Sequence, residues 1–430
     1  MLRNFDATQK KNFRISLLIG LGVFFLFIIP NMAASQNIAM VEVFSADEAS
    51  PLPYVFQMIK PGLPLVQTLK NFIFYSYYPY GFVYFAFSAL AVLPLQWLGA
   101  LENTTLVMLV LRQLVSVLPM LLALLILVYL QDEFRTYRSI VLFVFLACIP
   151  AVVQNNLWWH PDGLVTFFMA LALFFLYRDR LRFGKNYYFA AVACGLAIAT
   201  KLVGLYFFLA VGLTLILGLI QKKVTFMQAL KDGLFFILLM SVTYFAASPF
   251  WLSHWERAEF LQTMTQQSSA ISSGYGIVYA KGLVASWPLV HEYYGELIFL
   301  LLCLGLSIWG TLKGQKRLLY GLILAWLLPL SVMVFYFSHF KFQYWMPAVL
   351  PVLSSALLAL PEKWKFNRRI PTVSWLQFGA VLILLVQFGL FLKSDVPNFI
   401  SSVRRAENNP SIQFHDEVVR VLEPIETLPL

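Results

Sequence analysis

The sequence predicts an all-α polytopic membrane protein with about 11 transmembrane helices. Of its 430 residues, 60% are hydrophobic and 12% are charged, whereas a soluble chain carries about 25% charged residues. Apolar stretches of about 17 to 25 residues, long enough to cross a bilayer, recur along the chain. They are continuous rather than alternating. Because a backbone in lipid must satisfy its own hydrogen bonds, they predict helices.

The first predicted element is a retained membrane helix at 15–34. A basic segment precedes it, and the apolar stretch is too long for a signal-peptide core and lacks a small-residue cleavage site. We therefore expect the N-terminus to lie in the cytoplasm. Ten further spans are predicted at 112–130, 138–154, 163–177, 187–200, 203–220, 234–250, 294–312, 318–337, 345–360 and 373–392.

The distribution of charge predicts the orientation of these spans. Segments on the N-terminal side hold 20 of the 31 Lys and Arg residues but only 6 of the 21 Asp and Glu residues. This asymmetry follows the positive-inside rule, so the net charge of +10 reflects topology and not nucleic-acid binding. We expect one transmembrane domain over 1–392, with external loops at 36–111 and 251–293 and an external tail at 393–430.

Residues 81–98 are hydrophobic enough to span the membrane, but they conflict with this topology. Counting them as a span would move every later basic loop to the outside. We interpret them as a juxtamembrane helix or re-entrant hairpin against the outer leaflet. The alternative is a true span paired with 101–111.

Ionisable residues beside the apolar segments gather at the predicted outer face, where they are functional candidates. A carboxylate there can accept the proton of an attacking hydroxyl or amine. Lys or Arg can bind a phosphate and neutralise the charge that develops on it. The pattern favours a reaction between a phosphate-bearing lipid and a nucleophile. The candidates are Asp47, Glu48, Arg112, His160, Asp162, Lys201, Lys341 and Tyr344.

Each candidate also has a purely structural interpretation. Asp47 and Asp162 could cap helices, and Lys201 could extend to the membrane interface, as could Arg112. No metal site is predicted because the histidines match no ligand spacing, although the acidic residues could hold a divalent cation. Nearby aromatic residues are more typical of a membrane-interface belt than of a sugar site, namely Trp158, Trp159 and the run 75–80.

Together these motifs resemble the GT-C superfamily of membrane glycosyltransferases, and most closely its protein O-mannosyltransferase-like and aminoarabinose-transferase-like members. The resemblance runs from about residue 13 to 360. It rests on an acidic pair after the first span, an Arg opening the next, a His-Pro-Asp loop, a Thr-Lys at a later helix end and a basic run with Tyr before two prolines. There are two departures. Tyr78-Pro79-Tyr80 replaces a Lys-Pro-Pro-Leu-like run, and Lys341 is two residues farther from Tyr344 than the usual adjacent arginine.

The resemblance implies a GT-C-like fold and a glycosyltransferase, usually inverting, at a bacterial plasma membrane. It would transfer a sugar from a polyprenyl-phosphate carrier to a lipid, glycan or protein acceptor on the external or periplasmic face. Asp47 would be the general base, with Glu48 supporting it and Asp162 as the second acidic residue of the cavity. The residues implied to contact the donor are Arg112, His160, Lys201, Lys341 and Tyr344. The lack of a large extramembrane domain argues against transfer of a whole glycan to asparagine.

The main alternative is a transporter or flippase of lipid-linked sugars. Transporters tend to place polar groups near the bilayer midplane, in broken helices of related halves. Here the charges collect at one face, and the two halves show no matching interruptions. A third interpretation, a structural or assembly subunit, explains none of this clustering.

Overall fold

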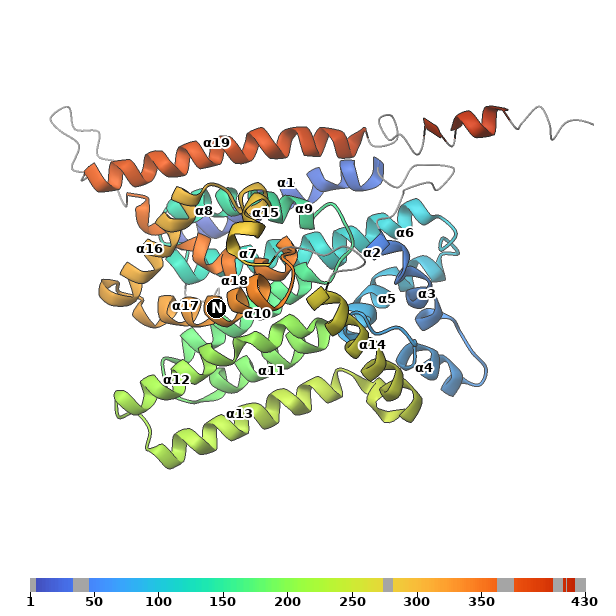
Figure 1. Cartoon of the computed structure of the whole chain (residues 1–430), viewed down its shortest axis with the longest axis horizontal. Coiled ribbons are helices and arrows are strands. Elements are labelled where there is room, and N and C mark those ends of the chain that lie inside the picture. Colours follow the sequence, from blue (N-terminus) through green and yellow to red (C-terminus); the bar gives the residue numbers. More distant parts are fainter. Residues whose placement is uncertain are drawn as a thin grey trace, which may run out of the picture.

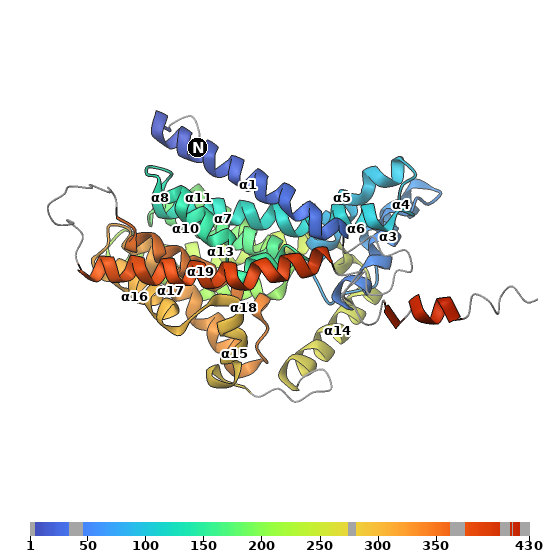
Figure 2. The same cartoon turned by 90° about the horizontal axis from the view of Figure 1, so that it is seen from above.

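The fold is all-helical, as predicted. The structure is a computed structural model that describes residues 5–33, 46–273, 281–361, 375–404, 413–414 and 416–421. All regular elements within these ranges are helices, and Figures 1 and 2 show the long ones running side by side. Seven described helices are long and apolar enough to cross a membrane, or up to eight if a bent pair forms one span. The chain is therefore an integral membrane protein, and the predicted count of eleven spans stays a prediction.

Each predicted span coincides with one or two helices. α8 and α9 divide the predicted span 138–154, and α19 continues well past the predicted end at 392. The helices are α1 (Ala7–Ala33), α7 (Leu118–Asp132), α8 (Arg138–Ala147), α9 (Pro150–Asn155), α10 (Asp162–Asp179), α11 (Lys185–Thr200), α12 (Phe208–Ile220), α13 (Phe226–Ala246), α16 (Leu297–Lys313), α17 (Arg317–Val332), α18 (Phe342–Leu353) and α19 (Trp375–Val403).

The predicted external loops are also largely helical. Residues 36–45 of the first loop lie outside the described residues, and so do parts of the loop after residue 361 and of the tail. The first loop gathers at one end of the molecule beside α14 (Figures 1 and 2). It contains α2 (Ala46–Ala49), α3 (Leu52–Ile59), α4 (Leu65–Ile73), α5 (Phe82–Trp97) and α6 (Thr104–Leu111), and the second contains α14 (His254–Ser273) and α15 (Leu283–Tyr294).

The predicted helix at 81–98 is present as α5. Its 16 residues rise about 24 Å at 1.5 Å per residue, less than the hydrocarbon thickness of about 30 Å. Its buried face packs into a small second core with residues of α3, α6 and the aromatic run before α5. Whether this helix belongs to the external loop or crosses the membrane stays a prediction.

The second predicted span, 112–130, lies within a longer helix. A continuous helical stretch begins eight residues earlier, at Thr104, and runs to Asp132. Asn103 caps it, because its side-chain oxygen accepts a hydrogen bond from the backbone N–H of Leu106 at 3.0 Å. Arg112 thus lies inside the helix, at the start of a π-helical turn, Arg112–Val117. Such turns occur frequently at functional sites.

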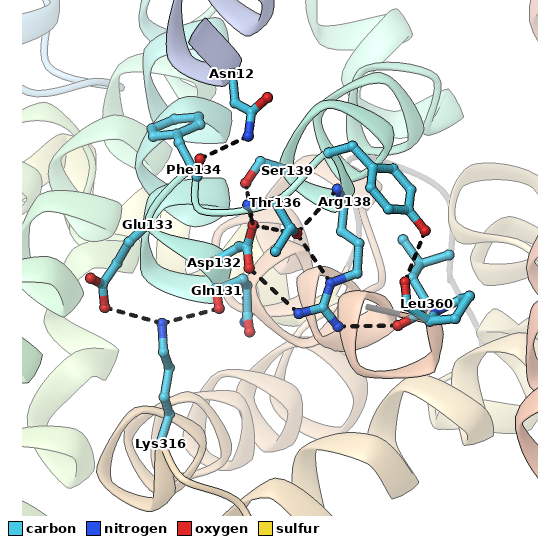
Figure 3. Close-up of polar contacts among 12 residues, drawn as sticks. Asn12, Gln131, Asp132, Glu133, Phe134, Thr136, Arg138, Ser139, Lys316 and Leu360 are labelled. Atoms are coloured by element: carbon cyan, nitrogen blue, oxygen red, sulfur yellow. Dashed lines mark hydrogen bonds and ion pairs between the residues drawn. The ribbon is translucent and has the colours of Figure 1, made fainter. Parts of the chain in front are cut away.

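Four segments predicted to share the N-terminal side of the membrane meet at one end of the bundle. The ammonium group of Lys316 donates to the carbonyl of Gln131 at 3.0 Å, and Arg138 donates to the carbonyl of Leu360 at 3.1 Å. Asn12, near the start of α1, donates to the carbonyl of Phe134 at 3.0 Å. Figure 3 shows these contacts joining α1, the loop after α7, the start of α17 and the chain after α18. Which side of the membrane this end faces stays a prediction.

Candidate active site

A cavity of about 820 Å³ lies at the other end of the bundle. α10 connects the two ends, and its 18 residues separate them by about 27 Å. The cavity wall is formed by α2, the chain before α5, the loop before α10, the junction of α11 and α12, α14 and the chain before α18. Five of the eight predicted site residues line it, namely Asp47, His160, Lys201, Lys341 and Tyr344.

The two residues of the acidic pair at 47–48 lie in different surroundings, one at the cavity and the other in the protein interior. Asp47 is partly exposed and lines the cavity. Glu48 is buried and accepts hydrogen bonds from Nε and Nη2 of Arg112 at 2.8 and 2.9 Å. It also accepts the backbone N–H of Trp159 at 2.6 Å. Glu48 therefore fixes the short helix that carries Asp47 and ties it to the loop before α10.

Arg112 is not among the residues that line the cavity. Its side chain is fully buried, and the guanidinium contacts Glu48 and donates to the backbone carbonyl of Asn31 at 3.3 Å. A carrier phosphate in the cavity would meet Lys201 and Lys341 instead. The geometry thus assigns Arg112 to holding Glu48, and its predicted contact with phosphate finds no support in this arrangement.

Asp162 is the first residue of α10 and lies directly behind the cavity wall. Its carboxylate is fully buried. One oxygen accepts a hydrogen bond from the ammonium group of Lys201 at 2.7 Å, and the other contacts Nδ1 of His160. Buried charges in proteins are normally paired in this way. Asp162 therefore positions two cavity-lining residues rather than lining the cavity itself.

His160 links Asp162 to a tyrosine. Its Nε2 lies 2.9 Å from the hydroxyl of Tyr80, and its ring stacks on Trp158 with centroids 4.3 Å apart. Burial lowers the pKa of His160, against the opposing effect of Asp162. Burial and, next, the charge of Asp47 raise the pKa of Tyr80 well above its ordinary value. A neutral imidazole thus donates through Nδ1 to Asp162 and accepts the Tyr80 O–H at Nε2.

Two cations lie beside one aromatic ring at the cavity wall. Nζ of Lys201 lies 4.5 Å from the ring centroid of Tyr344, and Nζ of Lys341 lies 5.8 Å from it. Both distances fall within the range of cation–π attraction. Lys201 caps α11 and Lys341 precedes α18, and both have extended backbones. These helix ends thus give the cavity a positive region next to an aromatic surface.

Tyr80 is a site residue that sequence reasoning missed. The aromatic-belt interpretation is wrong for Tyr75, Tyr78 and Trp159, because all three are buried inside the protein. Tyr80 and Tyr77 line the cavity. Tyr80 is held there by its neighbour Gly81, whose N–H donates to the carbonyl of Thr200 at 3.0 Å. A Cβ at residue 81 would lie 2.0 Å from the carbonyl oxygen of Ala199, so only glycine permits this approach.

The described residues contain no group of three or more His, Cys, Asp or Glu side chains that could hold a metal ion. In the cavity wall, the carboxylate of Asp47 is accompanied by His160, two lysines and tyrosines. This is a set suited to proton transfer and to binding an anion.

Comparison with known proteins shows a similar fold. No protein-family model matches the sequence, and no curated protein matches it. An apo crystal structure of an oligosaccharyltransferase from Archaeoglobus fulgidus aligns with 93% of this chain, with 14% sequence identity and a TM-score of 0.50. The archaeal oligosaccharyltransferase AglB from the same organism, in complex with an inhibitory peptide and a dolichol-phosphate, aligns with a TM-score of 0.49, also at 14% identity and 93% coverage. This chain covers 59% of the length of each.

Proposed function

We propose that this protein is an integral membrane glycosyltransferase that transfers a sugar from a polyprenyl-phosphate-linked donor to an acceptor on the external face. The observation that carries the proposal is the single cavity lined by Asp47, Lys201 and Lys341 at one end of the bundle. A carboxylate and two ammonium groups around one space provide a proton acceptor and a phosphate-binding region together. The fold shared with an oligosaccharyltransferase agrees with sugar transfer.

In the proposed reaction, Asp47 is the general base. An acceptor hydroxyl or amine attacks the anomeric carbon, and Asp47 takes its proton as the new bond forms. The bond between that carbon and the phosphate oxygen breaks, and the electron pair leaves with the polyprenyl phosphate. Attack opposite to the leaving group inverts the anomeric centre. Asp47 suits the base role better than Glu48, because the Glu48 carboxylate is already bound by Arg112 and Trp159.

Lys201 and Lys341 would stabilise the leaving phosphate. Negative charge grows on the phosphate oxygens as the sugar–oxygen bond breaks, and fixed cations stabilise that charge most in a partly desolvated site. Asp162 and the ring of Tyr344 hold the ammonium group of Lys201. This preorganisation lowers the cost of binding the phosphate at the moment of reaction.

The cavity also offers surfaces for the rest of the donor. Ile198, Leu202 and Val203 contribute an apolar flank suited to an isoprenoid chain. Tyr77 and Tyr80 provide aromatic and hydroxyl surface that can contact a sugar. The transporter alternative gains no support from this arrangement, since the buried charges at this site lie at one end of α10 and not near its middle.

The proposal is tested by adding purified protein and a polyprenyl-phosphate-linked radiolabelled sugar to membranes that lack the protein but retain its acceptors. Transfer of label to a membrane or protein fraction is expected. Asp47→Asn should reduce the rate by about 10²–10⁴-fold, and Glu102→Gln, which removes an exposed carboxylate from the same external loop, should not. An unimpaired Asp47→Asn protein would overturn the assignment of the base. Movement of donor between leaflets without its consumption would favour the transporter.

A further inference from the structure

A second, smaller pocket lies apart from the active-site cavity, between α9, α15 and α19. It has a volume of about 220 Å³, roughly that of seven water molecules in the liquid. Its wall is strongly polar, with Gln154 from α9, Glu292 from α15, and a group of residues on α19. That group is Ser394, Asp395, Asn398, Ser401 and Ser402. No Lys, Arg or His is among the described residues that line it.

Asp395 is the unusual residue in this pocket. Its side chain is 7% exposed, and neither carboxylate oxygen has a hydrogen-bond partner among the described residues. Isolated carboxylates are rarely buried, because desolvating a charge without a partner is very costly. An orphaned buried polar group of this kind commonly marks a bound water or ion.

The chemistry of the wall selects a cation over other ligands. Two carboxylates and no base repel phosphates and other anions. The amides of Gln154 and Asn398 and three serine hydroxyls add neutral oxygen atoms, the donor type that Mg²⁺ and Ca²⁺ prefer. Two carboxylates are fewer than a dedicated high-affinity site carries, and the described residues form no cluster of three metal-binding acids. The volume leaves room for several retained waters, as Mg²⁺ requires.

We infer that this pocket binds a hydrated divalent cation, held by Asp395 and Glu292 and completed by amide and hydroxyl oxygens. Dissociation constants of about 10⁻⁴–10⁻³ M are typical of extracellular sites of this kind. The ion joins α19 to α9 and α15. This inference is independent of the proposed sugar transfer.

The bound ion would also stabilise the elements that position His160 in the active site. α9 ends at Asn155, five residues before His160. On the other side, Tyr293 lines the pocket and stacks on Phe342 at 4.3 Å, and the ring of Phe342 lies 6.3 Å from that of Trp158. Trp158 in turn stacks on His160. An ion bound in the smaller pocket would thus restrain the elements that hold the imidazole of His160. It would do so without an ion in the active-site cavity.

The test is thermal unfolding of the purified, metal-free protein in detergent, titrated with MgCl₂ or CaCl₂ against a KCl series of equal ionic strength. If the dissociation constant is about 1 mM, 10 mM cation should raise the folded-to-unfolded ratio about tenfold, seen as a higher Tm. Asp395→Asn should abolish this shift. Gln154→Ala should weaken it, and Glu296→Gln, which removes an exposed carboxylate four residues from Glu292, should leave it intact.

The contrary outcomes are equally specific. If Asp395 is a buried acid that carries a proton and binds no ion, the Tm of the unsubstituted protein should be the same in MgCl₂ or CaCl₂ as in KCl of equal ionic strength. If Mg²⁺ or Ca²⁺ still raises the Tm of the Asp395→Asn variant, the ion binds elsewhere in the protein. Either result would overturn the inference, and both are read without any measurement of sugar transfer.

Discussion

Arg112 and Glu48, 64 residues apart in the chain, form a bidentate ion pair with both side chains 1% exposed. The pair joins the π-helical turn inside the helix Thr104–Asp132 to the short helix that carries Asp47. Arg112 is suited to this role because its planar guanidinium matches a carboxylate with two parallel hydrogen bonds. The neighbouring Asp47 makes the pair functionally important, because any movement of α2 moves the proposed base.

Breaking this ion pair should destabilise the protein strongly. Glu48→Gln removes the buried carboxylate that accepts two hydrogen bonds from Arg112, and breaking a buried ion pair in this way costs about 3–5 kcal/mol. Thermal unfolding in detergent should therefore give a clearly lower Tm. Asp47→Asn is the matched control, since it makes the same chemical change one residue away at the cavity, and it should keep the wild-type Tm. Equal Tm values for the two variants would contradict the positioning role of Glu48.

The two lysines of the cavity should respond differently to the same substitution. Lys201→Met removes a phosphate ligand and also leaves Asp162 without its ammonium partner, so both activity and Tm should fall. Lys341→Met removes a partly buried cation and should weaken both donor binding and stabilisation of the leaving phosphate, with little effect on Tm. A charge-assisted hydrogen bond contributes about 1.5–3 kcal/mol, so kcat/KM for the donor should fall about tenfold to hundredfold. Measurement of KM, kcat and Tm for both variants separates these effects; an unchanged kcat/KM in Lys341→Met would exclude it from the donor site.

The sequence was sufficient to predict the helices and the end of the bundle at which the polar residues gather. Hydropathy locates apolar segments, and loop charge alternates with each span, so Asp47, His160 and Lys341 could be placed together although they are far apart in the chain. The helix that contains the predicted span 112–130 begins earlier, at Thr104, and Asn103 followed by two threonines is its capping signal.

Side-chain partners could not be predicted in the same way. Asp47 and Glu48 are adjacent and chemically alike, and only the packing of α2 decides which one faces the cavity. Tyr80 lies in a run of aromatic residues, and its selection depends on the close approach of Gly81 to the end of α11. Such contacts arise from the packing of distant helices, about which a local pattern carries no information.

His160 should make the stability of the protein depend on pH. Burial lowers its pKa below the unfolded value of about 6.5, so the unfolded chain binds the proton more readily. The contribution of His160 is therefore fully present above about pH 6.5 and is lost as the pH falls below it, by at most about 1.4 kcal/mol per pH unit. Tm measured from pH 7.5 to 5 should fall less steeply in His160→Gln, which retains hydrogen-bonding capacity toward Tyr80 and Asp162. Parallel curves would show that the pKa of His160 is the same in the folded and unfolded protein, and would contradict the shift caused by burial.

The polar cluster at the opposite end should contribute to stability without affecting substrate binding. Asp132 accepts hydrogen bonds from the backbone and hydroxyl of Thr136 at 2.8 and 2.7 Å and from the hydroxyl of Ser139 at 2.8 Å (Figure 3). Asp132→Ala leaves these donors without a partner, at about 1–3 kcal/mol each where they are buried. Its Tm should fall while KM for the donor stays unchanged. Arg135→Ala breaks a pair in which the arginine side chain is 63% exposed and should cost less than about 1 kcal/mol.

The orientation of the bundle can be tested by labelling single cysteines in a variant that lacks Cys148, Cys194 and Cys303. Arg182 and Glu259 are both exposed, and they lie on loops that the charge pattern assigns to opposite sides of the membrane. The loop around Arg182 holds four basic residues and one acid in 178–185, so the positive-inside rule places it in the cytoplasm. A membrane-impermeant maleimide added to intact cells should label Glu259→Cys at once and Arg182→Cys only after permeabilisation. The reverse labelling pattern would mean that the bundle has the opposite orientation in the membrane and that the cavity of Asp47 and Lys201 faces the cytoplasm.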